Sequence, residues 1–375
     1  MTPAAPVPPM PTHNPDNERI KRRYFAYLKE ARRRGEPSVD AAAKALNRFE
    51  IHTRFRDFKA FHYEQAVAFK RHLAEQSNLR TGERLSKATL HSTLAALKAF
   101  FFWLAGQNGY RSRFTYSDAD YFNLSDRDSR IAKTRLEKPV PSLEQVRHVI
   151  ETMLAEDAIQ RRNRALVAFI LLTGARDGAI VSLKLKHLDM AQDRIIQDAR
   201  EVATKFGKSF DTYFFPVGDD VRLIVEEWAE YLGRELLWGP DDPLFPATRM
   251  DTGPDRLFHA VGLERKHWSS AGPIREVFRR AFAAAGLPYF APHRLRNTLV
   301  ALGQKRCHSP EEFKVWSQNL GHSQVLTTFT NYGNVSAGRQ AELMRSMGVD
   351  PGDKTEVAEQ MAQLAERLRR SGPAT

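Results

Sequence analysis

Side chains of the types that handle a phosphate group lie in four short segments of the C-terminal part of the chain. The segments contain Arg176, Lys205, His293, Arg296 and His322 in this order, and a tyrosine lies ten residues after the second histidine. Each pattern alone is weak, because a lone arginine or Gly-His pair is usually a surface or helix-end group. Together they predict a site for phosphoryl transfer. The segments are Thr173-Gly174-Ala175-Arg176, Thr204-Lys205-Phe206-Gly207-Lys208, His293-Arg294-Leu295-Arg296, and Leu320-Gly321-His322 with Tyr332.

These residue types meet the needs of a phosphodiester exchange. The transition state carries extra negative charge, which guanidinium groups meet with paired donors. A tyrosine hydroxyl has a pKa of about 10, so it needs a positive environment or a base to attack at neutral pH. The leaving alkoxide needs a proton donor, which a lysine can supply. The sequence holds neither a Gly-x-x-x-x-Gly-Lys-Ser/Thr loop nor the clustered carboxylates of a two-metal site, and we expect no metal ion and no cofactor.

With these motifs, the chain resembles the tyrosine recombinases of the phage-integrase family, over nearly its whole length up to Tyr332. The most specific part of the likeness is His293-x-x-Arg296, followed by Leu320-Gly321-His322 and the tyrosine. The resemblance implies that an N-terminal helical domain and a C-terminal catalytic domain clamp the DNA duplex.

The resemblance also implies a role for each motif residue. Tyr332 would be the nucleophile that forms a 3′-phosphotyrosyl bond and frees a 5′-hydroxyl. The other roles would be Arg176 and Arg296 for the non-bridging phosphate oxygens, His293 for proton transfer, Lys205 for protonation of the leaving oxygen, and His322 for a hydrogen bond to the phosphate.

Several points stay open at this level. Lys208 shares the lysine turn and is the alternative to Lys205. The family often has an acidic residue three places after the first arginine, where this chain has Ala179, and its usual gap before the tyrosine is nine residues, not ten. The competing functions are a type IB topoisomerase-like enzyme, which shares the chemistry, and a catalytically impaired DNA-binding relative.

The elements expected to position these residues are mainly helical. An apolar stripe over residues 20–31 and another from Ser86 to Gly106 predict helices of an N-terminal DNA-binding domain, which the resemblance identifies as a SAM-like core-binding domain. The aromatic run at 100–103 favours core packing over base stacking. The polar segment from Arg111 to Lys138 indicates a connection between domains.

The second part of the chain predicts a mixed α/β catalytic domain. Ser142 and Gln145 form a capping-box pattern, and further helices are expected near residues 165–172, 179–185, 221–232, 274–285, 294–304 and 310–320. Residues 194–196 and 212–215 indicate two strands of a small antiparallel sheet around the lysine turn. An amphipathic helix is expected at 355–370. The expected divisions are a disordered tail at 1–15, the helical domain at 16–130, a linker at 131–141, the catalytic domain at 142–348, and a C-terminal helix at 349–375 that could be exchanged between protomers.

The net charge of +12 is concentrated at the N-terminal end. Residues 1–135 hold 25 Lys and Arg against 14 Asp and Glu, whereas the rest of the chain holds 32 against 31. A domain biased in this way favours nucleic acid. We expect a cytoplasmic, nucleoid-associated protein without a membrane span that acts on double-stranded DNA recombination sites as a homotetramer, with accessory proteins possible. The candidate DNA-binding residues are Lys21, Arg22, Arg23, Arg32, Arg33, Arg34 and Lys87.

Overall fold

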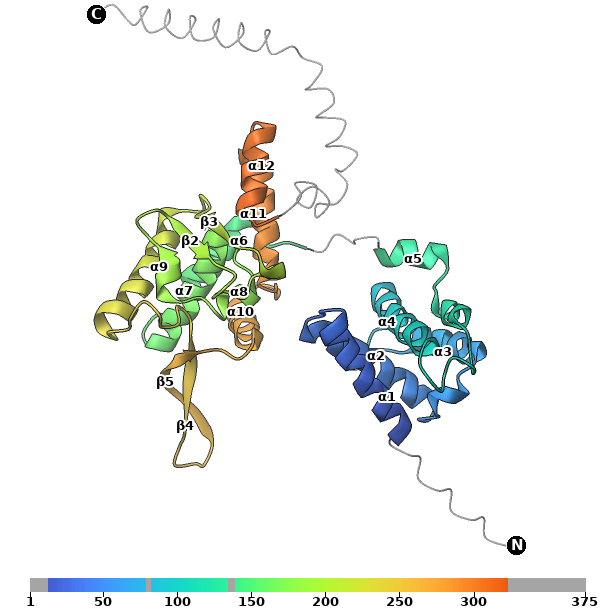
Figure 1. Ribbon diagram of the computed structural model, residues 1–375. Helices are drawn as coiled ribbons and strands as arrows, with labels where there is room; N and C mark the ends of the chain where they lie inside the picture. Colours follow the sequence, from blue (N-terminus) through green and yellow to red (C-terminus); the bar gives the residue numbers. More distant parts are fainter. Residues whose placement is uncertain (1–12, 79–81, 134–138, 323–375) are drawn as a thin grey trace, which may run out of the picture. The chain divides into compact units, whose positions relative to one another are not determined.

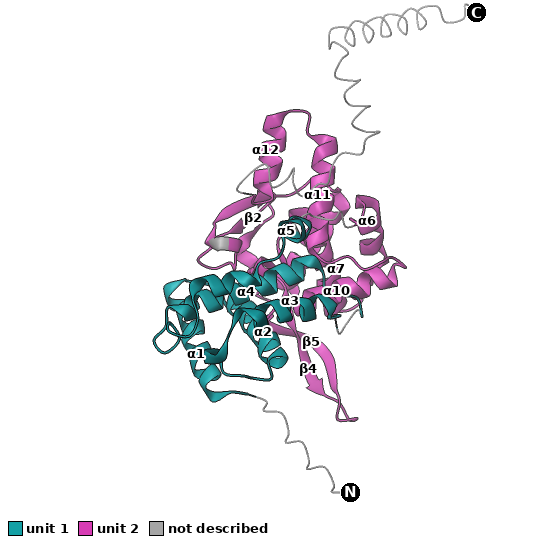
Figure 2. Cartoon of the chain, turned by 90° about the vertical axis from the view of Figure 1, so that its right-hand side faces the viewer, with its two compact units in different colours: residues 1–136 teal, residues 137–375 magenta. Residues whose placement is uncertain are grey.

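The computed structural model describes residues 13–78, 82–133 and 139–322, and these divide into two compact units. Unit 1 comprises Met1–Leu136 and unit 2 comprises Glu137–Thr375, as Figure 2 shows in two colours. The division falls inside the segment 131–141 that the sequence predicts to be a linker. The expected helix at 355–370 lies outside the described residues.

Unit 1 is helical and is built around an aromatic core (Figure 1). Phe49, Phe69, Phe101 and Phe122 are fully buried and meet mostly edge to face, a geometry that aromatic quadrupoles favour. Its elements are α1 Pro15–Ala26, which continues as a π-helical turn Tyr27–Ala31, α2 Glu36–His52, a 3₁₀ turn Phe58–Ala60, α3 Tyr63–Glu75, α4 Lys87–Ala105, a 3₁₀ helix Tyr116–Phe122, and α5 Asp126–Lys133.

Helix α4 organises this unit. Its N-cap is Ser86, whose hydroxyl accepts a hydrogen bond from the backbone of Thr89 at 3.2 Å, as the sequence predicts. Among the described helices, α4 alone is long and apolar enough to cross a membrane by length and composition. Phe100 and Phe101 lie in the protein core, however, and the helix packs against α2, α3 and α5. The aromatic run is therefore mainly core, although Phe102 is exposed.

Unit 2 surrounds the buried helix α7, which packs against α6, α9, α10 and α11. A three-stranded antiparallel sheet of order β1-β2-β3 lies beside it, with Ile195 opposite Thr212. The elements are α6 Leu143–Thr152, α7 Ala158–Thr173, α8 Asp177–Ile180, β1 Leu188–Asp189, β2 Arg194–Gln197, β3 Phe210–Tyr213, α9 Asp219–Glu230, β4 Pro246–Thr252, β5 Phe258–His267, α10 Gly272–Ala284, α11 His293–Arg306 and α12 Pro310–Asn319. The mainly helical fold with a small antiparallel sheet is confirmed.

Several parts of the fold differ from the sequence-based expectations. Helices α2 and α3 were not predicted, and the helix expected near residues 179–185 is the short α8, Asp177–Ile180. The segment from Arg111 to Lys138 is no simple connection, because the 3₁₀ helix Tyr116–Phe122 buries Ala119 and Phe122, and α5 packs on α4. The hairpin β4–β5 was not expected, and Figure 1 shows it extending away from the helices of unit 2. Residues 249–252 of β4 and 258–261 of β5 are exposed. Strands that bury neither face need no alternation of apolar and polar residues, which is the sequence signal of a half-buried strand.

Candidate active site

Arg296 joins the motif segments at the centre of unit 2. It lies one turn into α11 and is only 4% exposed. Its Nη1 donates to the carbonyl of Gly174 and its Nη2 donates to the carbonyl of Leu320. Nη2 also lies 3.3 Å from Nε2 of His322. One side chain therefore connects three segments that are far apart in the sequence.

The two glycines of these motifs permit this close approach. Gly174 ends α7 with φ +60°, and a Cβ there would meet the side chains of Leu299 and Leu320 at 3.0 Å. Gly321 has φ +66°, and a Cβ would lie 2.7 Å from the ring of Phe210 on β3. Only glycine adopts such backbone angles without steric cost. Both positions thus need glycine for the backbone angle and for space.

Arg176 lies at the N-terminal end of α8, two residues after Gly174, and is half-buried. Burial lowers the pKa of its guanidinium, and burial together with the charge of Arg176 lowers the pKa of Arg296 to about 9. Both groups are still protonated at neutral pH. The neighbouring Asp177 pairs with Arg275 of α10 at 2.9 Å, so its carboxylate neutralises the charge of Arg275.

The two histidines are neutral at neutral pH. Burial and the charges of Arg296 and Arg176 lower the pKa of His322 to about 4. Partial burial and the same two arginines also lower the pKa of His293, whose ring keeps contact with solvent. Neutral imidazoles can accept or relay a proton. The site therefore combines two cationic guanidinium groups with two imidazoles that can carry a proton.

Lys205 lies on a single 3₁₀ turn, Lys205–Gly207, between β2 and β3. Its side chain is exposed, and its charge is one of those that lower the pKa of His322. Lys208 is exposed as well and follows Gly207 at the start of the return to β3. Lys205 stays the predicted lysine of the site, with Lys208 as the alternative. The structure thus brings five predicted residues together, and Tyr332 lies outside the described residues.

Sequence reasoning missed the contacts that place α12 and the following Gly-His pair. Asn319 accepts a hydrogen bond from the backbone N–H of Tyr213 at 2.7 Å and donates to its carbonyl at 2.9 Å. The Asn319 carbonyl accepts from the hydroxyl of Thr212 at 3.1 Å. Trp316 donates to the carbonyl of Leu299 at 2.9 Å and covers Gly303 of α11. No local motif indicates these contacts, because the partners are distant in sequence.

The predicted DNA-binding residues of unit 1 have different surroundings. Lys21 pairs with the fully buried carboxylate of Glu50 at 2.6 Å, and Lys87 pairs with Asp128 at 2.9 Å. Lys21 therefore balances a buried charge inside the unit. The others lie at the surface: Arg22 is exposed, Arg23 donates to Gln107, Arg33 pairs with Glu30, and Arg32 and Arg34 line a cleft of about 1050 Å³ beside Tyr27 and Trp103.

Comparison with known proteins gives a consistent result. Tyrosine recombinase XerC of Lactobacillus delbrueckii subsp. bulgaricus is 25% identical over 253 residues, which cover 67% of this chain and 73% of the relative. XerD of Haemophilus ducreyi is 23% identical over 252 residues, which cover 66% and 73%. A lambda integrase dimer bound to a COC′ core site has a similar fold, with a TM-score of 0.58, 14% identity and coverage of 85% of this chain and 99% of that one. A post-cleavage complex of XerH with palindromic difH substrate has a TM-score of 0.57, 18% identity and coverage of 88% and 84%.

The family assignment rests on the catalytic part of the chain. Residues 142–339 match the model of the phage integrase family, and this range contains every motif residue of the site. The match covers more than half of the chain and includes Tyr332. The chain therefore belongs to the phage integrase family and is a tyrosine recombinase, an enzyme that cleaves and rejoins DNA.

Proposed function

We propose that this chain is a site-specific recombinase of the integrase or transposase type that exchanges strands between paired DNA sites as a homotetramer. The observation that carries the proposal is that Arg296 contacts both Gly174, two residues before Arg176, and His322, whose pKa is lowered by the nearby charges of Arg296, Arg176, His293 and Lys205. Relatives and structural neighbours of this class support it, among them a lambda integrase tetramer bound to a Holliday junction and a Tn1549 transposon integrase in complex with transposon right end DNA.

In the proposed reaction the phenol oxygen of Tyr332 attacks the scissile phosphorus. The bond from phosphorus to the 5′-oxygen breaks, and that oxygen takes a proton from Nζ of Lys205. Arg176 and Arg296 neutralise the charge that grows on the non-bridging oxygens. His293 accepts the phenol proton, and His322 holds the phosphate. Attack by a 5′-hydroxyl on the phosphotyrosyl bond reverses these steps, so rejoining needs no external energy source.

A covalent trap tests the chemistry. A duplex with a nick beside the cleavage position loses its short 5′-hydroxyl fragment, so the covalent adduct accumulates. We expect the wild-type chain to form this adduct and Tyr332→Phe to form none, while both bind the duplex equally. An adduct of unchanged yield on Tyr332→Phe would reject Tyr332 as the nucleophile.

Assembly distinguishes the recombinase from a topoisomerase-like enzyme. We expect exchange between two plasmids that carry the chain's own sites, and no relaxation of a supercoiled plasmid without a site. Site-independent relaxation by a monomer would favour the type IB topoisomerase reading. Binding without any adduct would favour a catalytically impaired relative.

The proposed role of unit 1 is to hold the DNA through exposed cations. Arg22, Arg23, Arg32 and Arg34 are the proposed phosphate contacts. Of the other predicted cations, Lys21 pairs with Glu50, Arg33 with Glu30 and Lys87 with Asp128 within the unit. With a basic domain and a DNA substrate, we propose that the protein acts in the cytoplasm on nucleoid DNA.

A further inference from the structure

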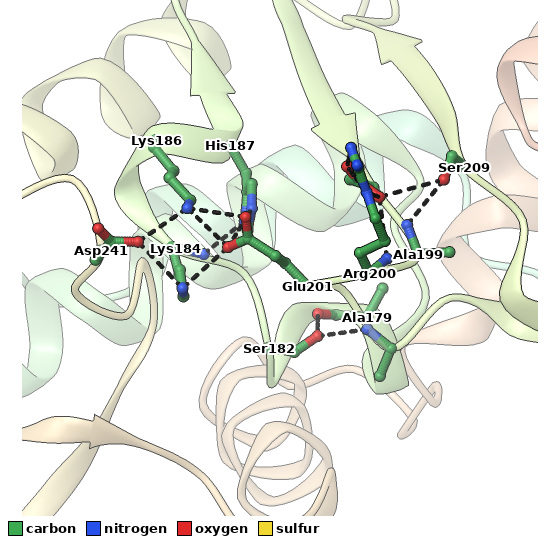
Figure 3. Close-up of polar contacts among 12 residues, drawn as sticks. Ala179, Ser182, Lys184, Lys186, His187, Ala199, Arg200, Glu201, Ser209 and Asp241 are labelled. Carbon is green, nitrogen blue, oxygen red and sulfur yellow. Dashed lines mark hydrogen bonds and ion pairs between the residues drawn. The ribbon is translucent and has the colours of Figure 1, made fainter.

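The lysine turn is attached to the rest of unit 2 by contacts that no motif marks. A general acid must stay within hydrogen-bond reach of the leaving oxygen, yet Lys205 lies on an irregular segment, 198–209, between two short strands. The neck of this segment is closed by the hydroxyl of Ser209, which accepts from the backbone of Ala199 at 2.9 Å. Figure 3 shows the polar contacts around it.

Glu201 is the first attachment of the segment. Its carboxylate accepts from Nζ of Lys184 at 2.9 Å and from Nζ of Lys186 at 2.9 Å. The Nε2 atom of buried His187 lies 3.7 Å away. Hydrogen bonds from the two lysines lower the pKa of Glu201, so the carboxylate is ionised at neutral pH. Asp241 joins the same two lysines from the other side.

The lysines that hold Glu201 lie on a stretch of backbone that is itself fixed by hydrogen bonds. Lys186 donates from its backbone to the carbonyl of Pro240 at 2.9 Å, and Leu185 donates to that of Asp242 at 3.0 Å. Leu183 and Leu244 on either side are fully buried. Glu201 is thereby tied to the hydrophobic core and not to another loose surface segment.

Ser182 is the second attachment. Its hydroxyl accepts from the backbone N–H of Ala203 at 2.8 Å and donates to the carbonyl of Ala179 at 2.8 Å. It therefore bridges the segment that follows Arg176 and the segment that carries Lys205 (Figure 3). Ala179 occupies the place where the family often has an acidic side chain, and here its backbone carbonyl takes part in the connection instead.

We infer that Glu201 and Ser182 are positioning residues that hold Lys205 at the leaving oxygen. The inference rests on the proposed role of Lys205 as the general acid. Loss of either attachment lets the turn move relative to Arg176 while the arginines and histidines keep their own contacts. Because a shift of about 1 Å in a reacting group can cost about 100-fold in rate, we expect Glu201→Ala to slow DNA cleavage about 10- to 100-fold.

The test compares two leaving groups in single-turnover cleavage of a nicked duplex. In one substrate the 5′-bridging atom is oxygen, and in the other it is sulfur. A thiol has a pKa of about 8.5, so sulfur leaves as a thiolate with the bonding electrons and needs no proton. We expect Lys205→Ala, Glu201→Ala and Ser182→Ala to be slow on the oxygen substrate and close to wild type on the sulfur substrate.

Glu226→Ala is the matched control. Glu226 pairs with Arg222 on α9 at 2.8 Å, and its exposed fraction is 35%, against 36% for Glu201. We expect this variant to cleave both substrates at the wild-type rate. It shows whether loss of a half-exposed, ion-paired carboxylate elsewhere in unit 2 is harmless.

Each outcome bears on a different part of the inference. Equal slowing of Glu201→Ala on both substrates, or no slowing on either, would overturn the positioning role. If Lys205→Ala is rescued by sulfur but Glu201→Ala is not, the positioning inference alone fails. If Lys205→Ala itself is not rescued, the assignment of the general acid fails, and the positioning inference fails with it.

Discussion

Substitution of Gly321 by alanine tests how the Gly-His pair is held. Gly321 has φ +66°, and a Cβ added to it would lie 2.7 Å from the ring of Phe210. A left-handed backbone costs a non-glycine residue about 1 to 2 kcal/mol. Forcing a methyl group into a packed contact costs about 1 to 3 kcal/mol more. We expect Gly321→Ala to lower the free energy of unfolding by about 2 to 5 kcal/mol.

A double-mutant cycle separates the two costs. Phe210→Leu removes the ring atoms that the new methyl group would meet, so in that background Gly321→Ala should cost only the backbone part, about 1 to 2 kcal/mol. Gly286→Ala is the control, because Gly286 has φ +68° and its Cβ would meet nothing within 4 Å. Urea unfolding of the full chain measures all four variants and the wild type.

The same variant should affect the reaction, because His322 directly follows Gly321. We expect adduct formation by Gly321→Ala to fall about 100-fold and that by Gly286→Ala to stay unchanged. The steric argument is refuted if Gly321→Ala costs no more than Gly286→Ala, or if its cost is the same with leucine at position 210.

Three further predictions follow from the charges and from the chain's end. The pKa of His322 is lowered to about 4 in the folded chain, so between about pH 4 and 6.5 only the unfolded chain binds a proton at this residue. The free energy of unfolding should therefore rise with pH in this window, and it should rise less in His322→Gln. Urea unfolding at several pH values measures this difference. Lys21→Ala leaves the Glu50 carboxylate buried and should cost about 3 to 5 kcal/mol, whereas Arg22→Ala should keep stability and lower the salt slope of DNA binding by about 1; the opposite pattern in unfolding and filter-binding assays would contradict this assignment. Deletion of residues 350–375 should abolish strand exchange and spare DNA binding, and retained exchange would end the idea of a swapped helix.

Local signals explain what could be predicted from the sequence. Ser142 and Gln145 form the reciprocal cap that the pattern indicates, with hydrogen bonds of 3.1 and 2.9 Å, because a capping box involves only one helical turn. Helix α7 ends at Gly174, because the left-handed backbone conformation of this glycine stops the helix. Val39, Ala42, Leu46 and Phe49 of α2 also have helical spacing and are buried, so that missed helix did carry a readable signal.

Other features depend on contacts that no local pattern contains. The exposed part of the hairpin β4–β5 buries neither face, so hydrophobic periodicity cannot indicate it. The pairing of Glu201 with Lys184 and Lys186 looks in the sequence like ordinary surface charge. The resemblance gave the identities of the site residues, whereas the structure gives the carbonyl groups and glycines that bring them together.

Arg296 holds the motif segments together and is also the residue that we propose to bind the phosphate, and its geometry explains how one side chain can do both. A guanidinium has five N–H donors in a rigid plane. Among the described residues, one donor of Nη1 goes to Gly174 and those of Nη2 go to Leu320 and His322. Nε and the second donor of Nη1 point in different directions, so each remains to donate to a single phosphate oxygen. A lysine has three donors on one atom and cannot span both carbonyls while also donating to a phosphate. The need for arginine at this position therefore comes from the two carbonyl groups it joins as much as from the charge of the proposed phosphate.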